Sequence, residues 1–197
     1  MRILEGTNVD LIEPFPTSQV QRAVGWLHCY KTLVTTDDGP QTDEDFAHCL
    51  MEMITRPTTR SWGLIDKHNK LNIHHEAPLV GFIIFERTGR RNGYCHIATT
   101  RRAWGSGLID EAIRIGMADT FESDPDLLRI STFVMNTNSP ARALLKRIGF
   151  VYEGTLRDYS MQNGEPRPIS HFGITRREWE AQQNPVPVEP ESESIEA

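Results

Sequence analysis

Helical spacing of apolar residues dominates the first quarter of the chain and then gives way to shorter apolar runs. Residues 9–14 (VDLIEP) predict a short strand that prolines end, and Thr17–Leu33 carries apolar residues at helical spacing. A second helix is predicted after Thr42, because its hydroxyl can cap the helix while Asp45 occupies the reciprocal position of a capping box. The chain therefore begins with a predicted strand and two predicted helices.

Apolar runs rich in β-branched and aromatic residues follow the two helices and predict strands. These runs cover residues 61–66, 78–87 and 93–99. Polar residues separate the first run from the second, and the sequence TGRRNG separates the second from the third, so each junction predicts a turn. We therefore expect three consecutive strands in the middle of the chain.

The second half of the chain alternates between helical and strand patterns. A helical pattern extends to about Phe121, residues 127–135 predict a β-branched strand, and SPARALLKRI predicts a short helix. Ser139 is expected to cap this short helix, with Pro140 at its first position and Gly149 just after its end.

Two antiparallel strands are predicted near the end of the folded part. They cover residues 150–160 and 169–175 around the turn sequence QNGEP, and residues 176–181 close the domain. The complete order is strand, two helices, three strands, helix, strand, helix and two strands. This order predicts an α+β or α/β domain with a mixed sheet.

The domain organisation is predicted as one folded unit and a tail. A chain of 197 residues suits a single domain with a sizeable core, which we assign to residues 1–183. Residues 184–197 (NPVPVEPESESIEA) are rich in Pro, Glu and Ser, and this composition predicts a disordered acidic tail.

Charge and cysteine content restrict the partners and the compartment. The formal net charge of -6 makes nucleic acid an improbable partner, although part of the charge belongs to the tail. Three widely spaced cysteines indicate a reducing, cytoplasmic location, and no apolar run predicts a membrane span or a signal peptide. The adjacent His74 and His75 lie in a polar stretch, so a surface loop is expected there and no metal site.

The stretch TTRRAWGSGLIDEAIR, residues 99–114, places Gly105 and Gly107 immediately before a predicted helix. The first turn of a helix has free N–H groups and the positive end of the helix dipole, so it can bind an anion. Glycines let the backbone approach a phosphate closely. This stretch predicts a phosphate site, and an ordinary loop before an ordinary helix is the alternative.

Three segments of the sequence resemble the GNAT superfamily of acyl-CoA-dependent N-acetyltransferases, and its RimJ/RimL-like branch most of all. The segments are WGSGLIDEAIR, NSPARALLKRIGFVYEGTLRD, and the NG turn that leads to ISHFGITRREW. The resemblance covers roughly residues 9–179 in layout. It implies an α/β sandwich with a mixed, mostly antiparallel central sheet flanked by helices, and it implies acetyl-CoA as the cosubstrate.

The resemblance also implies which residues contact acetyl-CoA. The residues whose backbone N–H groups would bind the pyrophosphate are Gly105, Ser106, Gly107 and Leu108. The strand residues that would pair with the pantetheine arm are His96, Ile97, Ala98 and Thr99. Asn138 would lie near the pantetheine, and Trp104 belongs to the predicted binding set. Arg101 and Arg102 are expected to meet the CoA phosphates, with a solvated basic loop as the alternative.

Acetyl transfer to an amine needs a group that takes the amine proton and a group that protonates the leaving thiolate. His96 is the first candidate base, because it precedes the glycine turn and imidazole titrates near neutrality; a hydrogen-bonded strand histidine is the alternative. Glu86 is the second candidate base, with a solvated edge carboxylate as its alternative. Ser139 and Tyr159 are the candidate acids, with helix capping and strand packing as their alternatives.

Two functions are open from the sequence. The favoured one is acetyl-CoA-dependent transfer of an acetyl group to a primary amine, such as a protein N-terminus, a lysine or a small molecule, in a ternary complex. The alternative is a GNAT-fold protein with lost or weak catalysis that serves as a component of a larger assembly. It arises because Leu145 and Ala141 stand where the resemblance implies an acidic hydroxyl group. A homodimer is compatible with both functions.

Overall fold

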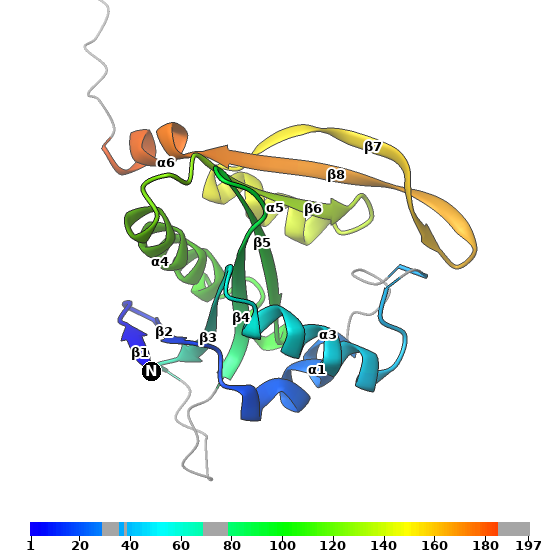
Figure 1. The fold of residues 1–197 in the computed structure, drawn as a ribbon, viewed down its shortest axis with the longest axis horizontal. Helices are drawn as coiled ribbons and strands as arrows, with labels where there is room; N and C mark the ends of the chain where they lie inside the picture. The colour runs from blue at the N-terminus through cyan, green and yellow to red at the C-terminus, as the bar shows by residue number, and fades with distance from the viewer. Residues whose placement is uncertain (29–35, 38, 69–78, 185–197) are drawn as a thin grey trace, which may run out of the picture.

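The computed structural model describes residues 1–28, 36–37, 39–68 and 79–184, which form an eight-stranded sheet with helices on both faces (Figure 1). The strands are β1 (Arg2–Leu4), β2 (Val9–Glu13), β3 (Thr59–Asp66), β4 (Leu79–Arg87), β5 (Asn92–Thr99), β6 (Arg129–Met135), β7 (Val151–Gln162) and β8 (Glu165–Thr175). The helices are α1 (Val20–His28), α3 (Asp43–Thr55), α4 (Leu108–Ser123), α5 (Ser139–Ile148) and α6 (Arg176–Gln183), with short 3-10 turns η1 (Thr17–Gln19) and η2 (Arg101–Ala103).

The sheet has the order β1-β2-β3-β4-β5-β6-β8-β7. Every neighbouring pair is antiparallel except β5 and β6, which are parallel. This arrangement confirms the predicted α+β fold with a mixed, mostly antiparallel sheet. The strand β1 was not predicted, because three residues are too few to show an alternating pattern; it pairs with β2 from Arg2 opposite Glu13 to Leu4 opposite Leu11.

Two buried clusters lie on opposite faces of the sheet, because successive strand residues point to opposite sides. One cluster packs under α4, α5 and α6 and includes Ile113, Ile148 and Trp179. The other packs under α1 and α3 and includes Ala23 and Leu50. Figure 1 shows α4 on one side of the sheet and the α1–α3 pair on the other.

Local capping signals fix several helix ends as predicted. Thr42 and Asp45 form the reciprocal capping box at the start of α3, and Gly149 ends α5 in the left-handed region at a φ of 106°. One capping prediction was wrong. Asn138, not Ser139, caps α5: its side-chain oxygen accepts a hydrogen bond from the N–H of Ala141 at 3.2 Å, so Ser139 is already the first helical residue. Both residue types cap helices well, and only the backbone geometry decides between them.

Several predictions concern residues outside the described part of the chain. They are the last turn of the predicted helix to Leu33, the polar loop with His74 and His75, and the tail after Asn184. Within the described residues, no helix has the length and apolar character needed to cross a lipid bilayer.

Candidate active site

The strands β5 and β6 separate shortly after their parallel pairing begins. The register ends where Tyr94 pairs with Ser131, whereas β5 continues to Thr99 and β6 continues to Met135. The Tyr94 hydroxyl occupies the apex of this separation and accepts a hydrogen bond from the N–H of Phe133 at 2.8 Å. The sheet therefore has a wedge-shaped opening between the carboxyl ends of its two parallel strands, where ligands commonly bind in open sheets.

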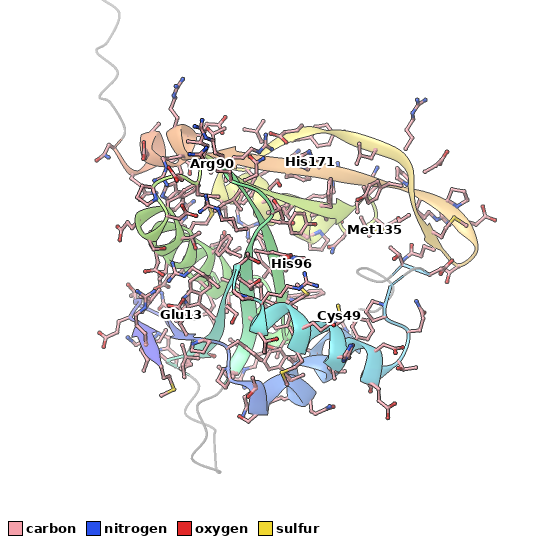
Figure 2. The ribbon with its side chains drawn as sticks, viewed as in Figure 1. Glu13, Cys49, Arg90, His96, Met135 and His171 are labelled. Carbon is pink, nitrogen blue, oxygen red and sulfur yellow. The ribbon has the colours of Figure 1, made fainter. Side chains whose placement is uncertain are left out.

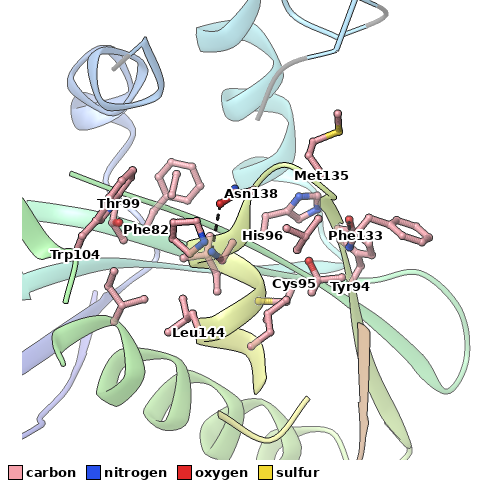
Figure 3. A pocket seen from close by; sticks show the side chains of 18 of the residues that line it. Phe82, Tyr94, Cys95, His96, Thr99, Trp104, Phe133, Met135, Asn138 and Leu144 are labelled. Atoms are coloured by element: carbon pink, nitrogen blue, oxygen red, sulfur yellow. Dashed lines mark hydrogen bonds between the residues drawn. The ribbon is translucent and has the colours of Figure 1, made fainter. Parts of the chain in front are cut away.

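A cavity of about 830 Å³ lies in this opening and is bounded from both faces of the sheet (Figure 3). Its lining includes Ile109 and Leu145 from the core beneath α4, and Leu50 and Phe82 from the core beneath α3. The cavity thus connects the starts of α4 and α5 on one face with the surface of α3 on the other. Its volume is that of a site for a ligand of moderate size.

The glycine turn before α4 has the backbone conformation that only glycine adopts easily. Gly105 has a φ of 71° and Gly107, the N-cap of α4, has a φ of 82°. A Cβ at either position would meet no atom within 4 Å, so the turn faces open space. Among the described residues, no acceptor is found for the N–H group of Gly107. These features fit an anion that approaches the backbone closely.

The hydroxyl of Ser106 organises the same turn. It donates a hydrogen bond to the carbonyl oxygen of Ala103 at 2.8 Å and accepts one from the N–H of Leu108 at 3.3 Å. The N–H of Leu108, predicted to bind pyrophosphate, therefore already has a partner within the chain. An anion at this turn would therefore have to bind N–H groups other than that of Leu108, such as those of the two glycines.

His96 lies on the face of β5 that is directed toward α3, and it lines the cavity. Its Nε2 atom is buried without a hydrogen-bond partner among the described residues and is 3.8 Å from Oε2 of Glu86. Glu86 is paired with Arg56 at 2.8 Å. Burial lowers the pKa of His96 below its ordinary value, and the Glu86 carboxylate opposes this shift. At neutral pH the imidazole is therefore neutral and able to accept a proton.

Aromatic rings surround this histidine. The Tyr94 ring has its centroid 4.6 Å from that of His96 and 5.7 Å from that of Phe133. Burial raises the pKa of the Tyr94 hydroxyl, which keeps it protonated as a neutral side chain. The aromatic wall thus excludes water from one side of the imidazole.

A family model described as "Acetyltransferase (GNAT) domain" matches residues 12–151, which include β5, β6 and the glycine turn before α4. The chain belongs to the GNAT acetyltransferase family. The family predicted from the sequence is therefore confirmed.

One curated relative resembles this GNAT domain in sequence. A Bacillus subtilis (strain 168) protein named "Putative ribosomal N-acetyltransferase YdaF" is 33% identical over 120 residues, which cover 61% of this chain and 56% of the relative. The chain thus spans little more than half of that curated relative's length.

Two solved structures share the fold at lower sequence identity. The ribosomal L7/L12 alpha-N-protein acetyltransferase RimL, solved in complex with coenzyme A, has a TM-score of 0.70 at 14% identity, covering 88% of this chain and 98% of that chain. A mutant of spermidine N-acetyltransferase SpeG from Vibrio cholerae has a TM-score of 0.71 at 15% identity, covering 90% of this chain and 99% of that chain. At these identities the likeness concerns the fold alone.

The GNAT domain brings some predicted cofactor residues to the cavity and leaves others beside it. The predicted residues that line the cavity are His96, Ile97, Ala98, Thr99, Trp104, Gly105 and Asn138. The predicted residues next to it in the turn, but outside its lining, are Arg101, Arg102, Ser106, Gly107 and Leu108. Arg101 and Arg102 are exposed, and the Arg101 guanidinium lies 5.9 Å from the Trp104 ring centroid.

The candidate acids are separated by the structure. Ser139 is exposed at the start of α5 and does not line the cavity. Tyr159 lines the cavity, and its ring centroid is 5.4 Å from that of Phe133. Leu145 and Ala141 also line the cavity, but neither side chain can donate a proton. Tyr159 is thus the predicted acid that reaches the cavity.

Sequence reasoning missed one wall of the site. Phe46, Cys49 and Met53 of α3 line the cavity together with Met135 of β6. Figure 2 shows Cys49 on α3 and Met135 at the end of β6. Phe46 and Met53 lie on one apolar face of this helix, and helical spacing alone does not show that such a face lines a cavity. Tyr94 was also missed, because the sequence around it gives no signal that two strands separate there.

Proposed function

We propose that this GNAT domain transfers the acetyl group of acetyl-CoA to a primary amine in a ternary complex. The observation that carries the proposal is one cavity that joins the glycine turn before α4 to the half-buried His96, whose pKa is lowered by burial. When bound, acetyl-CoA would supply the acetyl group as an activated thioester.

The residues at the α4 side would hold the cosubstrate. Gly105 and Gly107 leave open space and free N–H groups for the pyrophosphate, and Arg101 and Arg102 add positive charge beside them. The β5–β6 ladder ends at Tyr94, so the backbone of β5 just beyond it is positioned to bond an extended amide-containing arm.

The acceptor amine would enter from the α3 side, where His96 is directed. An amine attacks only when neutral, so a base must remove its proton. The imidazole of His96 accepts that proton, directly or through one water, and Glu86 stabilises the imidazolium that results. In this proposal His96 is the base, and the negative charge of Glu86 stabilises its protonated form.

Protonation of the leaving thiolate is assigned to the Tyr159 hydroxyl. Tyr159 is 53% exposed, so solvent water can also supply the proton. A domain without turnover is the alternative function, favoured by the apolar side chains of Leu145 and Ala141 in the cavity wall.

Two measurements separate these functions. Calorimetry with CoA tests the binding site, and release of free thiol from acetyl-CoA with a panel of amines tests turnover. Binding together with amine-dependent thiol release supports acetyl transfer. Binding without release for any amine supports the alternative, and the absence of binding at millimolar CoA contradicts acetyl transfer.

We also propose a reducing, cytoplasmic compartment, and the cysteines support it. Cys49 and Cys95 are both free thiols, and Cys95 is buried. Burial raises the pKa of the Cys95 thiol far above its ordinary value, so it stays unreactive.

A further inference from the structure

The acceptor side of the cavity is built from apolar side chains. Phe46, Cys49 and Met53 of α3 form one wall, each of them half-buried, and Met135 and Ile169 belong to the opposite wall. Figure 3 shows Met135 and His96 on the same side of the opening, with α3 beyond them. A group attached to an amine that reaches His96 would therefore be surrounded by apolar surface.

Formal charges are scarce in the described lining and lie at the other end of the cavity. The Asp and Arg side chains among the lining residues are Asp110 of α4 and Arg147 of α5. They bond to each other through two contacts of 3.0 Å, Nε to Oδ1 and Nη2 to Oδ2. Neither can serve as a counter-ion for an acceptor on the α3 side.

Two carboxylates next to lining residues of the acceptor side are engaged as well. Both oxygens of Asp37 accept hydrogen bonds from the β7–β8 turn, from the N–H of Asn163 at 2.9 Å and from that of Gly164 at 2.7 Å. Glu86 lies behind His96 and is paired with Arg56. A second ammonium group in this part of the cavity would lose its hydration without gaining a carboxylate partner among the described residues, which is unfavourable.

We infer that the acceptor is a primary amine with a single positive charge and an apolar or aromatic group within a few atoms of the nitrogen. This inference rests on the proposed acetyl transfer and names its acceptor class. The same chemistry occurs in a small arylalkylamine and in a peptide whose first side chain is apolar. It disfavours polyamines, because their second and third ammonium groups need carboxylates, and the described residues of the wall provide none on the α3 side.

The direct test compares kcat/KM for four acceptors with the wild-type protein at one pH. They are phenethylamine, a tetrapeptide that begins with Phe, the same tetrapeptide beginning with Asp, and spermidine. We expect phenethylamine or the Phe peptide to exceed both charged acceptors by at least about 10-fold, the discrimination that a hydrophobic pocket commonly provides. The better of the two apolar acceptors distinguishes a small-molecule source from a peptide source.

The outcomes separate this inference from the function on which it rests. Spermidine as the best acceptor, or equal values for all four, would overturn the inference while acetyl transfer stands. Thiol release with none of the amines would instead contradict the proposed function.

A variant of the apolar wall gives an independent test. Met53→Glu places a carboxylate beside the acceptor, and Glu52→Gln changes a charge on the exposed surface of the same helix as the matched control. We expect Met53→Glu to lower kcat/KM for the apolar acceptor by about 10-fold or more and to raise the spermidine-to-apolar ratio, with unchanged CoA binding. Glu52→Gln should leave the ratio as in the wild type. If Met53→Glu does not fold, Met53→Gln is the replacement, and an unchanged ratio in a folded variant contradicts the inference.

Discussion

The Nε2 atom of His96 lies 3.8 Å from Oε2 of Glu86, while Oε1 of the same carboxylate lies 2.8 Å from Nη1 of Arg56. The negative charge behind the histidine is therefore partly compensated by the arginine. The Glu86 carboxylate raises the pKa of His96 by less than burial lowers it, so the pKa of His96 lies below its ordinary value. A neutral imidazole with a carboxylate behind it is suited to accept a proton and then to carry the charge.

The first prediction concerns pH. Protonated His96 cannot act as a base, so kcat should rise with pH through the pKa of the imidazole and reach its plateau above it. Because that pKa is lowered, the midpoint should lie below the ordinary value of about 6.5. His96→Ala should remove this limb and lower kcat by about 10²-fold, with CoA affinity retained. A limb that persists in His96→Ala would assign the titration to another group.

The second prediction concerns the glycine turn. Gly107→Val forces a β-branched residue into a positive φ, at a cost of about 1–3 kcal/mol, and places a side chain where the pyrophosphate is proposed to bind. We expect calorimetry to show at least a 10-fold loss of CoA affinity, while circular dichroism remains native.

Gly164→Val is the control for strain in this experiment. Gly164 has a φ of 74° and open space around its Cβ position, but it lies in the β7–β8 turn. The two variants should lose similar stability, and only Gly107→Val should lose binding. Equal loss of CoA affinity in both would attribute the effect to folding.

The third prediction concerns the Tyr94 hydroxyl, at the point where β5 and β6 separate. Tyr94→Phe keeps the ring beside His96 and removes the oxygen that accepts the Phe133 N–H. Leaving that N–H unpaired should lower the free energy of unfolding by about 1–3 kcal/mol, measured by urea denaturation. Tyr152→Phe is the control, because its hydroxyl bonds Thr155 in an exposed place, and it should change stability by less than about 0.5 kcal/mol. A Tyr94→Phe protein as stable as the wild type would show that water replaces the hydroxyl.

The fourth prediction concerns the tail. Residues 185–197 have a composition that cannot bury an apolar core, so their deletion should leave the melting temperature nearly unchanged. Differential scanning calorimetry of the shortened and full chains measures this directly. A fall of many degrees would show that the tail binds the domain, and residues 1–183 would then not be an independent unit.

Local features of the fold were predictable because nearby residues determine them. The capping box of Thr42 and Asp45 needs four consecutive residues, and Gly149 needs only the end of a helical pattern. Ser139 was misplaced by one position because Asn138 has the same capping chemistry. The turn with Gly105 and Gly107 was recognised by its residue types, and its positive φ angles agree with that interpretation.

The cavity could not be derived in the same way, because it depends on contacts between distant segments. The opening forms where Tyr94 and Ser131 end their pairing, and no local pattern near either residue marks that point. On α3, Leu50 is buried in the core, whereas Phe46 and Met53 of the same apolar face remain partly accessible and line the cavity. Hydrophobic period identifies the face, but it does not tell a packed residue from a ligand-facing one.

The join between β5 and β6 consists of the pairs Asn92–Arg129, Gly93–Ile130 and Tyr94–Ser131. Strands β2 to β5 on one side and β6, β8 and β7 on the other are each held by longer antiparallel ladders. We therefore expect the short join to act as a hinge, with amide hydrogens of its residues exchanging faster than those within either ladder. A small rotation about it would widen or narrow the gap between the two halves, so few backbone pairs resist such a motion at the place where ligands would enter.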